Sequence, residues 1–385
     1  MIPYGKQDIS QDDIDSVIEV LRSDFLTQGP KVPLFEQSLA NYCKVDHAIA
    51  FNSATSALHI ACRALELGPG DLLWTSPITF VASANCGLYC GATVDFVDID
   101  SKTFNLCADE LESKLRQAKQ VGKLPKVVIP VHMAGQCCDM KRIHELSLEY
   151  GFYIIEDASH AIGARYLDQT VGNCRYSDIT VFSFHPVKII TTAEGGVAMT
   201  QSESLALKMN LLRSHGITRD TCSMKNKPHG GWYYEQIDLG FNYRMTEMQA
   251  ALGISQLNRL DEFVAKRHLL ANRYNALLKD LPLTVPYQFP DSYSSFHLYP
   301  IQLDIGNLNK TQSEIFAELK EQSIGVNLHY IPVHMQPYYT ALGFQIGDFP
   351  TAENYYSKAM SIPLYYGMTI EDQDTVVNVL AQVLL

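Results

Sequence analysis

The sequence predicts an α/β fold, in which a large domain with a mostly parallel sheet flanked by helices is followed by a smaller α+β C-terminal domain. Three observations support this prediction. Strand-like apolar segments alternate with helical patterns over the first part of the chain, which is typical of parallel sheets covered by helices. The pattern changes to longer helices near Met245. The 385 residues also exceed the length of one ordinary domain.

The first expected element is a helix that begins after Ser10. The segment Ser10–Asp13 is typical of a helix cap, and apolar residues continue at helical spacing to Leu21. Seven strands are then expected, at His47–Phe51, Leu72–Thr75, Thr93–Val97, Val127–Val131, Phe152–Ile155, Ile179–Phe184 and Gly196–Met199. Helical patterns fall between most of them, at Thr55–Leu65, Val81–Leu88, Ala108–Gln117, Asp139–Tyr150 and Glu203–Ser214.

The last part of the chain predicts a different arrangement. One long helical segment runs from Met245 to about Leu278. A smaller α+β unit is expected from four later segments, Phe296–Leu303, Thr311–Glu321, Gly325–Tyr330 and Asp372–Leu384. We therefore expect a large domain over residues 1–245, with an N-terminal arm, and a small domain over residues 246–385.

Composition and charge limit the classes of function. No apolar run approaches the roughly 18 residues of a membrane span, and the N-terminal segment lacks the layout of a secretory signal. The nine cysteines are scattered and form no CxxC pair, so we expect buried thiols in a reducing compartment and no metal site. A formal charge of −12 argues against nucleic-acid binding but allows a nucleotide ligand. We expect a cytoplasmic protein without a membrane partner.

Asp157 is the first candidate for chemistry. It ends an apolar strand that starts at Tyr153, and ligands of open α/β sheets bind beyond the carboxyl ends of the strands. A carboxylate there could partner the ring nitrogen of a pyridoxal cofactor, which must stay protonated to accept electrons. An aspartate that caps the next helix is the alternative interpretation.

Lys188 is the second candidate. It lies in a largely apolar stretch between Ser183 and Gly196, where partial desolvation would leave its amine able to react with an aldehyde. Ser183 could donate a hydrogen bond to a phosphate. Gly195 and Gly196 allow the backbone to pass close to a ligand, or simply make a tight turn. A solvated surface charge is the ordinary alternative for a lone lysine.

The segment Asn52–Leu58 joins a strand to a helix through small hydroxyl residues. The free N–H groups of a helix start, with hydroxyl groups beside them, are suited to a phosphate. Simple helix capping by Ser53 or Thr55 is equally compatible with the local sequence. The segment therefore gives two interpretations of equal weight.

The order of these segments carries further information. A phosphate-binding turn, an aromatic stretch at Thr79-Phe80, then Asp157 and Lys188 resemble a fold-type I pyridoxal enzyme. The chain is similar to the sugar aminotransferases of the DegT/DnrJ/EryC1/StrS family. The matching segments are Leu26–Gly29, Asn52–Ser56, Glu156–His160, Ser183–Gly196 and Gly240–Thr246.

The resemblance implies a homodimeric pyridoxal 5′-phosphate (PLP) enzyme with two catalytic residues. Lys188 matches the lysine that forms a covalent aldimine with the cofactor, and Asp157 matches the partner of its ring nitrogen. Asn242 matches a residue that reaches the cofactor of the neighbouring subunit, which implies shared active sites. Phe80 matches an aromatic ring stacked on the cofactor, and His160 a side chain near its phenolic oxygen. The cofactor contacts implied in this way are Ala54, Thr55, Ser56, Phe80, Asp157, His160, Ser183, Lys188 and Asn242.

Several segments look like the branch of this family that serves pseudaminic acid biosynthesis. They are Ser159–Gly163, Phe184–Lys188, Thr191–Glu194 and Arg213–Gly216. Ala193 stands where many members have Gly, and this branch shares that departure. The resemblance implies that a UDP-linked 4-keto-6-deoxy sugar is aminated with L-glutamate. The substrate contacts implied are Tyr4, Asp24, Phe25, Leu26, Thr27, Asn327, Leu328, His329 and Tyr330.

Three alternatives stay open beside this interpretation. An aminotransferase of the same family could use another nucleotide-linked keto-sugar. A sugar dehydratase of the same fold is disfavoured because histidine replaces the lysine there, whereas this chain has Lys188. A non-catalytic cofactor-binding protein is disfavoured because both Lys188 and Asp157 are present. His329 and His334 suggest a metal site, but contact with a sugar or phosphate fits them better.

Overall fold

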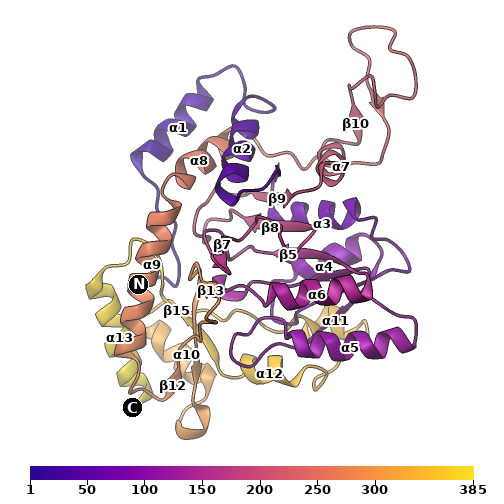
Figure 1. Ribbon diagram of the computed structural model, residues 1–385. Helices are drawn as coiled ribbons and strands as arrows, with labels where there is room; N and C mark the ends of the chain where they lie inside the picture. The colour runs from indigo at the N-terminus through magenta and orange to yellow at the C-terminus, as the bar shows by residue number, and fades with distance from the viewer.

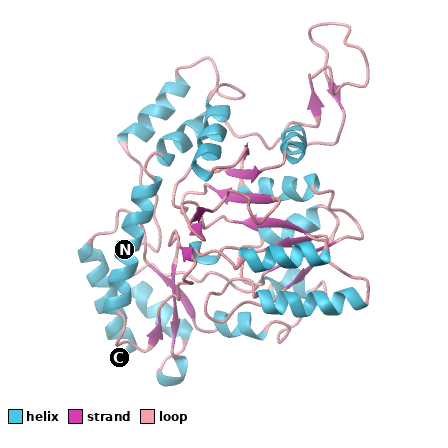
Figure 2. Cartoon of the chain, in the orientation of Figure 1, coloured by secondary structure: helices cyan, strands magenta, loops and turns pink.

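The computed structural model describes residues 1–385 and has one large sheet at its centre (Figures 1 and 2). Seven strands form it in the order β1-β9-β8-β5-β4-β2-β3. Their bounds are β1 His47–Phe51, β2 Leu72–Thr75, β3 Thr93–Phe96, β4 Val127–Ile129, β5 Tyr153–Asp157, β8 Ile179–Ser183 and β9 Gly196–Thr200. β9 is antiparallel to β1 and β8, and the other neighbouring pairs are parallel.

The reversal of β9 has a local cause. β9 follows β8 through the loop that carries Lys188, with no helix between the two strands. Parallel neighbours need a long crossover, whereas strands joined by a loop can pair antiparallel. The predicted mostly parallel sheet, flanked by helices, is confirmed.

Helices cover both faces of this sheet (Figure 1). In the first part of the chain the helix bounds are α1 Gln11–Leu21, α2 Lys31–Cys43, α3 Ala54–Ala64, α4 Ala82–Tyr89, α5 Ala108–Gln120, α6 Met140–Tyr150 and α7 Glu203–Arg213, with a 3₁₀ turn at Met133–Gly135. The predicted helix after Ser10 is present. The Ser10 hydroxyl accepts a hydrogen bond from the Asp13 N–H, and the Asp13 carboxylate accepts one from the Ser10 N–H.

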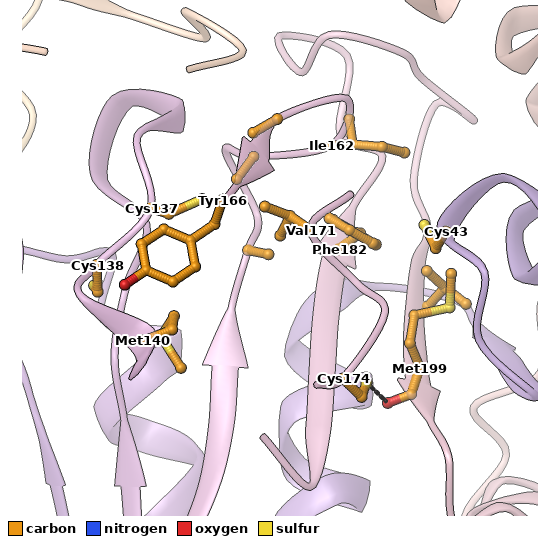
Figure 3. Close-up of a cluster of buried hydrophobic side chains, with 14 of the residues drawn as sticks. Cys43, Cys137, Cys138, Met140, Ile162, Tyr166, Val171, Cys174, Phe182 and Met199 are labelled. Carbon is orange, nitrogen blue, oxygen red and sulfur yellow. Dashed lines mark hydrogen bonds between the residues drawn. The ribbon is translucent and has the colours of Figure 1, made fainter. Parts of the chain in front are cut away.

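Alternating side chains of the strands build two separate cores. Ile154 of β5 packs into a core with α2, α5 and α6, whereas its neighbour Ile155 packs into a second core with α3, α4 and α7. Figure 3 shows part of the first core around Phe182. Because both faces of each strand are buried, the strands appear in the sequence as continuous apolar runs.

The expectation of buried thiols is only partly correct. Seven of the nine cysteines are buried and all nine are free. Cys107 is partly exposed, and Cys222 is exposed in the segment that joins β10 (Ile217–Thr218) to β11 (Glu235–Gln236). These two short strands form a hairpin that projects from the body of the molecule (Figure 1).

The long helix expected from Met245 to Leu278 is two helices, α8 Glu247–Leu257 and α9 Leu260–Leu277. A capping box between Thr246 and Gln249 starts α8. The break lies at Arg259, whose backbone leaves helical geometry and whose guanidinium binds the carboxylate of Asp8 at 2.5 Å. Helical periodicity continues through such a break, so the sequence pattern did not reveal it.

The C-terminal part forms a third core around the antiparallel sheet β12-β14-β15. The element bounds are β12 Leu283–Thr284, β14 Tyr299–Leu303, α10 Gln312–Glu321, α11 Pro337–Thr340, α12 Pro350–Tyr356, β15 Ala359–Ile362 and α13 Ile370–Leu384, with 3₁₀ turns at Ile305–Asn307 and Val333–Met335. Segment 325–330, expected in this unit, forms only an isolated bridge between Asn327 and Ser361.

Three further short strands, β6 Arg165–Tyr166, β7 Gln169–Thr170 and β13 Ser292–Tyr293, form one small sheet. α8 packs against α1 and α2, and the third core begins at Leu270 within α9. The division into domains at residues 245 and 246 stays a prediction. No helix has the length and apolar character needed to cross a membrane.

Candidate active site

A cavity of about 550 Å³ lies at the carboxyl ends of β5 and β8. Its walls come from the start of α3, the loop after β8 and segment 327–330. Volumes of this size are typical of small-molecule sites, and this end of an open α/β sheet is where ligands bind. Side chains far apart in the sequence therefore meet in one place.

Asp157 is buried in this cavity and held by two donors. The Ser83 hydroxyl donates to Oδ2 at 2.6 Å, and the Ser159 N–H donates to Oδ1 at 3.1 Å. The Thr79 hydroxyl lies 2.7 Å from that of Ser83 and can donate to it. These contacts fix the carboxylate and leave acceptor capacity for a ligand, since a carboxylate has about four lone-pair sites.

Lys188 lies in the cavity wall, on the loop between β8 and β9. Burial lowers the pKa of its amine to about 8, although the negative charge of Asp157 acts in the opposite direction. The loop is braced by Thr191, whose hydroxyl donates to the Phe184 carbonyl at 2.9 Å. Ala193 has φ 65°, a left-handed conformation that favours glycine. A lysine with a lowered pKa can supply a neutral amine near neutral pH.

The start of α3 forms a corner of the cavity that is suited to an anion. Ala54 and Thr55 line it at the first turn, where helix N–H groups have no acceptor in the helix. The Ser53 hydroxyl caps the helix by accepting from the Ser56 N–H at 3.1 Å. Gly196 lies directly beneath, and a Cβ atom there would be 2.5 Å from the backbone N of Ala54. Only glycine allows this close approach.

Two histidines form another wall. His160 Nε2 lies 3.1 Å from the Tyr330 hydroxyl, and the ring of His160 lies 4.4 Å from that of His297. Burial, with the charge of Lys188 as the next cause, holds the pKa of His160 well below its ordinary value. Burial also lowers the pKa of His297. Nδ1 of each ring is buried without a hydrogen-bond partner. Unpaired buried nitrogens are typical of a site that a bound polar group completes.

Most of the residues expected from the sequence line this cavity. They are Tyr4, Ala54, Thr55, Phe80, Asp157, His160, Ser183, Lys188, Asn327, Leu328, His329 and Tyr330. Phe80 is 59% exposed at the rim, with its ring 6.3 Å from that of Tyr330. Burial lowers the pKa of His329 to about 3, so its imidazole is neutral.

The other expected residues lie outside the cavity of this single chain. The hydroxyl of Ser56 bonds to Asn52 Oδ1 at 2.6 Å. Asn242 pairs with Ser214, away from the cavity lining. Segment 24–27 also lies apart from it, with Phe25 and Leu26 exposed and Thr27 opposite Thr246.

Sequence reasoning missed several residues of the site. Ser159, His185 and Glu194 line the cavity and lie inside the matching segments, so a closer reading of those segments could have found them. His297 lines it too, but no motif surrounds it. Ser83 showed only as one polar residue in a helical pattern. The roles of His297 and Ser83 can be recognised only from their positions in the folded chain.

Comparison with known proteins then identifies the family. The model of the DegT/DnrJ/EryC1/StrS aminotransferase family matches residues 7–381. The chain belongs to this family. It is a sugar aminotransferase, and its fold and the resemblance inferred from its motifs are confirmed.

Relatives match this aminotransferase over nearly their whole length. The spore coat polysaccharide biosynthesis protein SpsC of Bacillus subtilis is 39% identical, over 98% of this chain and 95% of the relative. UDP-4-amino-4,6-dideoxy-N-acetyl-beta-L-altrosamine transaminase of Campylobacter jejuni is 38% identical, over 100% of this chain and 98% of the relative.

Solved structures agree with this assignment. Helicobacter pylori PseC, an aminotransferase involved in the biosynthesis of pseudoaminic acid, superposes with a TM-score of 0.91 at 32% identity, covering 100% of this chain and 99% of that chain. The PLP form of Spr1654 from Streptococcus pneumoniae superposes with a TM-score of 0.88 at 29% identity, and all of both chains is covered.

Proposed function

We propose that this aminotransferase transfers the amino group of L-glutamate to C4 of a UDP-linked 4-keto-6-deoxy sugar, UDP-4-keto-6-deoxy-L-AltNAc. The product is UDP-4-amino-4,6-dideoxy-N-acetyl-β-L-altrosamine, for pseudaminic acid biosynthesis. The observation that carries the proposal is the meeting of Lys188, Asp157 and the start of α3 in one cavity whose other wall includes Tyr4 and segment 327–330.

The cofactor is pyridoxal 5′-phosphate, and the residues present fit it. The start of α3 offers N–H groups and hydroxyls to a phosphate, with Gly196 allowing the close packing beneath it. Asp157 offers a braced carboxylate to the ring nitrogen. The unpaired Nδ1 of His160 leaves a hydrogen bond for the ring oxygen. Lys188 offers the amine that holds the aldehyde carbon.

The chain's own residues divide the chemistry between them. PLP, when bound, withdraws electrons from the bonds at Cα of the amino donor. Asp157 keeps the ring nitrogen protonated, which maintains that withdrawal. With the cofactor bound, the amine of Lys188 would take up the proton from Cα of glutamate and, in the second half-reaction, would give a proton to C4 of the sugar. His160 and Tyr330 orient the ring through a shared hydrogen bond.

The choice of sugar is supported by the similarity to the Campylobacter jejuni transaminase and to Helicobacter pylori PseC. A second candidate is the same reaction on another nucleotide-linked keto-sugar. It is compatible with the Bacillus subtilis relative, which is named for spore coat polysaccharide biosynthesis and is 39% identical to this chain, against 38% for the transaminase. The experiment must therefore separate substrates within one reaction type.

The test follows the visible absorption of the PLP-bound protein. L-Glutamate is expected to abolish the band, and UDP-4-keto-6-deoxy-L-AltNAc to restore it, with the amino sugar identified by mass. A GDP-linked 4-keto-6-deoxy sugar serves as the matched control. A band that returns only with the control sugar would reject the proposed substrate and keep the aminotransferase.

We also infer a homodimer with shared active sites and a cytoplasmic location. Asn242 and segment 24–27 lie outside the cavity of their own chain, which is compatible with contact to a partner's site. All nine cysteines are free thiols, as a reducing compartment would keep them.

A further inference from the structure

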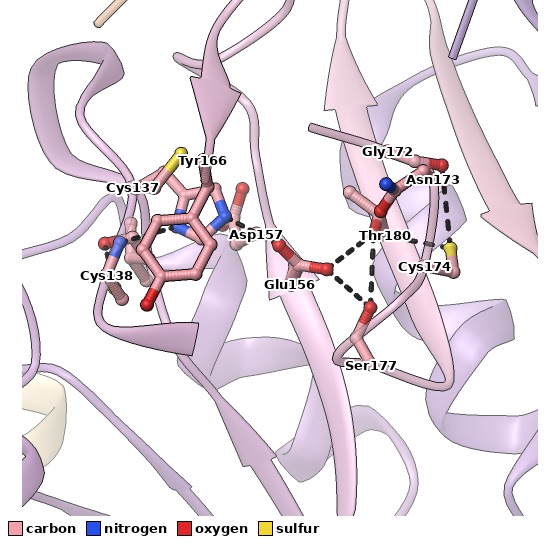
Figure 4. Close-up of polar contacts among 12 residues, drawn as sticks. Cys137, Cys138, Glu156, Asp157, Tyr166, Gly172, Asn173, Cys174, Ser177 and Thr180 are labelled. Atoms are coloured by element: carbon pink, nitrogen blue, oxygen red, sulfur yellow. Dashed lines mark hydrogen bonds and ion pairs between the residues drawn. The ribbon is translucent and has the colours of Figure 1, made fainter. Parts of the chain in front are cut away.

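A second buried carboxylate lies behind Asp157 and has no part in the mechanism above. Glu156 is 6% exposed, and its side chain points to the opposite face of β5 from Asp157, because strand side chains alternate. Three groups donate to its carboxylate. They are His132 Nε2 at 2.8 Å, and the Thr180 hydroxyl at 2.9 Å and the Ser177 hydroxyl, which Figure 4 shows beside Glu156.

The hydrogen bonds show which ring nitrogen of His132 donates to Glu156. His132 Nδ1 faces the backbone N–H of Cys138 at 3.3 Å, so Nδ1 is the acceptor and Nε2 carries the proton. Nε2 therefore donates to Glu156. The hydrogen bonds from His132, Ser177 and Thr180 outweigh burial, and the pKa of Glu156 is lowered. A buried anion with three donors is geometrically well defined.

The same cluster is tied to Asp157 through the backbone. The His132 N–H donates to the Asp157 carbonyl at 3.1 Å, and the Asp157 N–H donates to the Pro130 carbonyl at 2.9 Å. Thr180 belongs to β8, the strand that ends at Ser183 in the cavity. Glu156 thus joins the segment after β4, the strand β5 and the strand β8 next to Asp157.

We propose that Glu156 and His132 are positioning residues for the aminotransferase reaction. Their hydrogen bond fixes the end of β5, and with it the direction in which the Asp157 carboxylate meets the ring nitrogen. The inference rests on the proposed function only for the cofactor and the glutamate half-reaction, and is independent of the sugar. If the Asp157 carboxylate points in a slightly different direction, its contact with the ring nitrogen weakens and so does the electron withdrawal by the ring. The start of α3, where the phosphate would bind, is unchanged.

The test compares Glu156→Gln with the wild-type holoenzyme. Gln keeps the shape but removes the negative charge, so the charge-assisted hydrogen bonds from His132, Ser177 and Thr180 are lost or weakened. The glutamate half-reaction, measured by stopped-flow loss of the visible band, is expected to slow by about tenfold. The wavelength and pH midpoint of that band are expected to shift, and the KM for glutamate to change less than the rate.

A stability control separates positioning from folding. Ile143→Ala removes a buried side chain of the same core that forms no hydrogen bond with the cluster, and should lower the melting temperature while leaving the half-reaction rate and the band unchanged. Glu156→Gln with a lowered melting temperature but a normal rate and band would overturn the proposal.

A milder variant covers the case in which Glu156→Gln does not fold. Ser177→Ala removes one donor from Glu156 at a half-buried position, and a decrease of a few-fold in the half-reaction rate is expected. An unchanged rate in folded Ser177→Ala would also overturn the proposal.

The wild-type protein separates this inference from the proposed function. If the wild-type protein binds PLP and reacts with glutamate but rejects the sugar, only the proposed substrate fails. If it binds no PLP, the proposed function and this inference fail together.

Discussion

At the scale of single residues, environment decides chemistry. Lys188 and Asp157 are ordinary residue types, but burial lowers the pKa of the lysine and two donors brace the carboxylate. Burial also keeps His160 and His329 neutral, so they act as hydrogen-bonding groups and not as cations. The sequence could name Lys188, Asp157 and His160 because they lie in the matching segments, and His329 through the substrate contacts that the resemblance implies. It could not give their pKa values, which depend on neighbours from other elements.

The lowered pKa of Lys188 predicts the pH dependence of cofactor uptake. Only the neutral amine attacks the PLP aldehyde, so the rate of covalent attachment to the apo-protein is expected to rise with pH and level off above about 8. With a lysine of ordinary pKa, the rate of attachment would continue to rise toward about pH 10.4. Growth of the visible band in stopped flow measures this, with Lys188→Ala as the blank. A rate that still climbs beyond pH 9.5 would contradict a pKa of about 8.

Ser83 is predicted to support Asp157. Ser83→Ala removes the 2.6 Å hydrogen bond to Oδ2, and a hydrogen bond to a charged group contributes about 1.5–3 kcal/mol. We expect the glutamate half-reaction to slow at least about tenfold, since less of the bound ring would stay protonated. Ser147→Ala is the control, because that hydroxyl donates only to the His144 carbonyl within α6. Equal rates in the two variants would reject the role of Ser83.

At the scale of elements, the sequence pattern and the structure agree best where an element is short and bounded. The strands of the large sheet lie within a few residues of their predicted ends, because buried parallel strands are apolar throughout. The prediction of one long helix was the main error. The helix breaks at Arg259, whose guanidinium forms an ion pair with Asp8 near the N-terminus. No local pattern contains that information.

Helix α3 allows a prediction at this scale. Ser53→Ala removes its N-cap hydrogen bond, and Thr369→Ala removes the equivalent bond at α13, where Thr369 does not line the cavity. Each is expected to lower the free energy of unfolding by about 1 kcal/mol, measured in urea. Only Ser53→Ala should weaken PLP binding, by roughly tenfold, because Ser53 also lines the cavity at the start of α3, where we propose that the phosphate binds. Equal PLP affinity in both variants would show that the cap is purely structural.

At the scale of the whole molecule, several residues that were expected at the active site do not line the cavity of their own chain. Asn242 and segment 24–27 are outside the cavity, and apolar side chains such as Phe25, Leu239 and Trp232 are more than half exposed. The β10–β11 hairpin also extends away from the body (Figure 1). Exposed apolar groups of this kind are typical of surfaces that another chain covers.

Shared sites predict complementation between two defective variants. Lys188→Ala and Asn242→Ala are each expected to have little activity alone. After mixed refolding, half of the dimers would pair one chain of each kind, and one of their two sites would be intact, which gives about a quarter of wild-type activity. No recovery, with dimers present by sedimentation, would mean that Asn242 does not serve the partner's site.

The sequence by itself determined the fold class and the family, and it predicted the two residues of the proposed chemistry. Those features depend on local periodicity and on motifs in a fixed order, which a linear chain displays directly. Only the tertiary structure decided which motif residues meet. It brought His297 and Ser83 to the site and left Ser56 and Asn242 outside the cavity. It also joined Glu156 to His132 behind Asp157. These contacts link residues far apart in the chain, and their hydrogen bonds and burial exist only after the strands have paired.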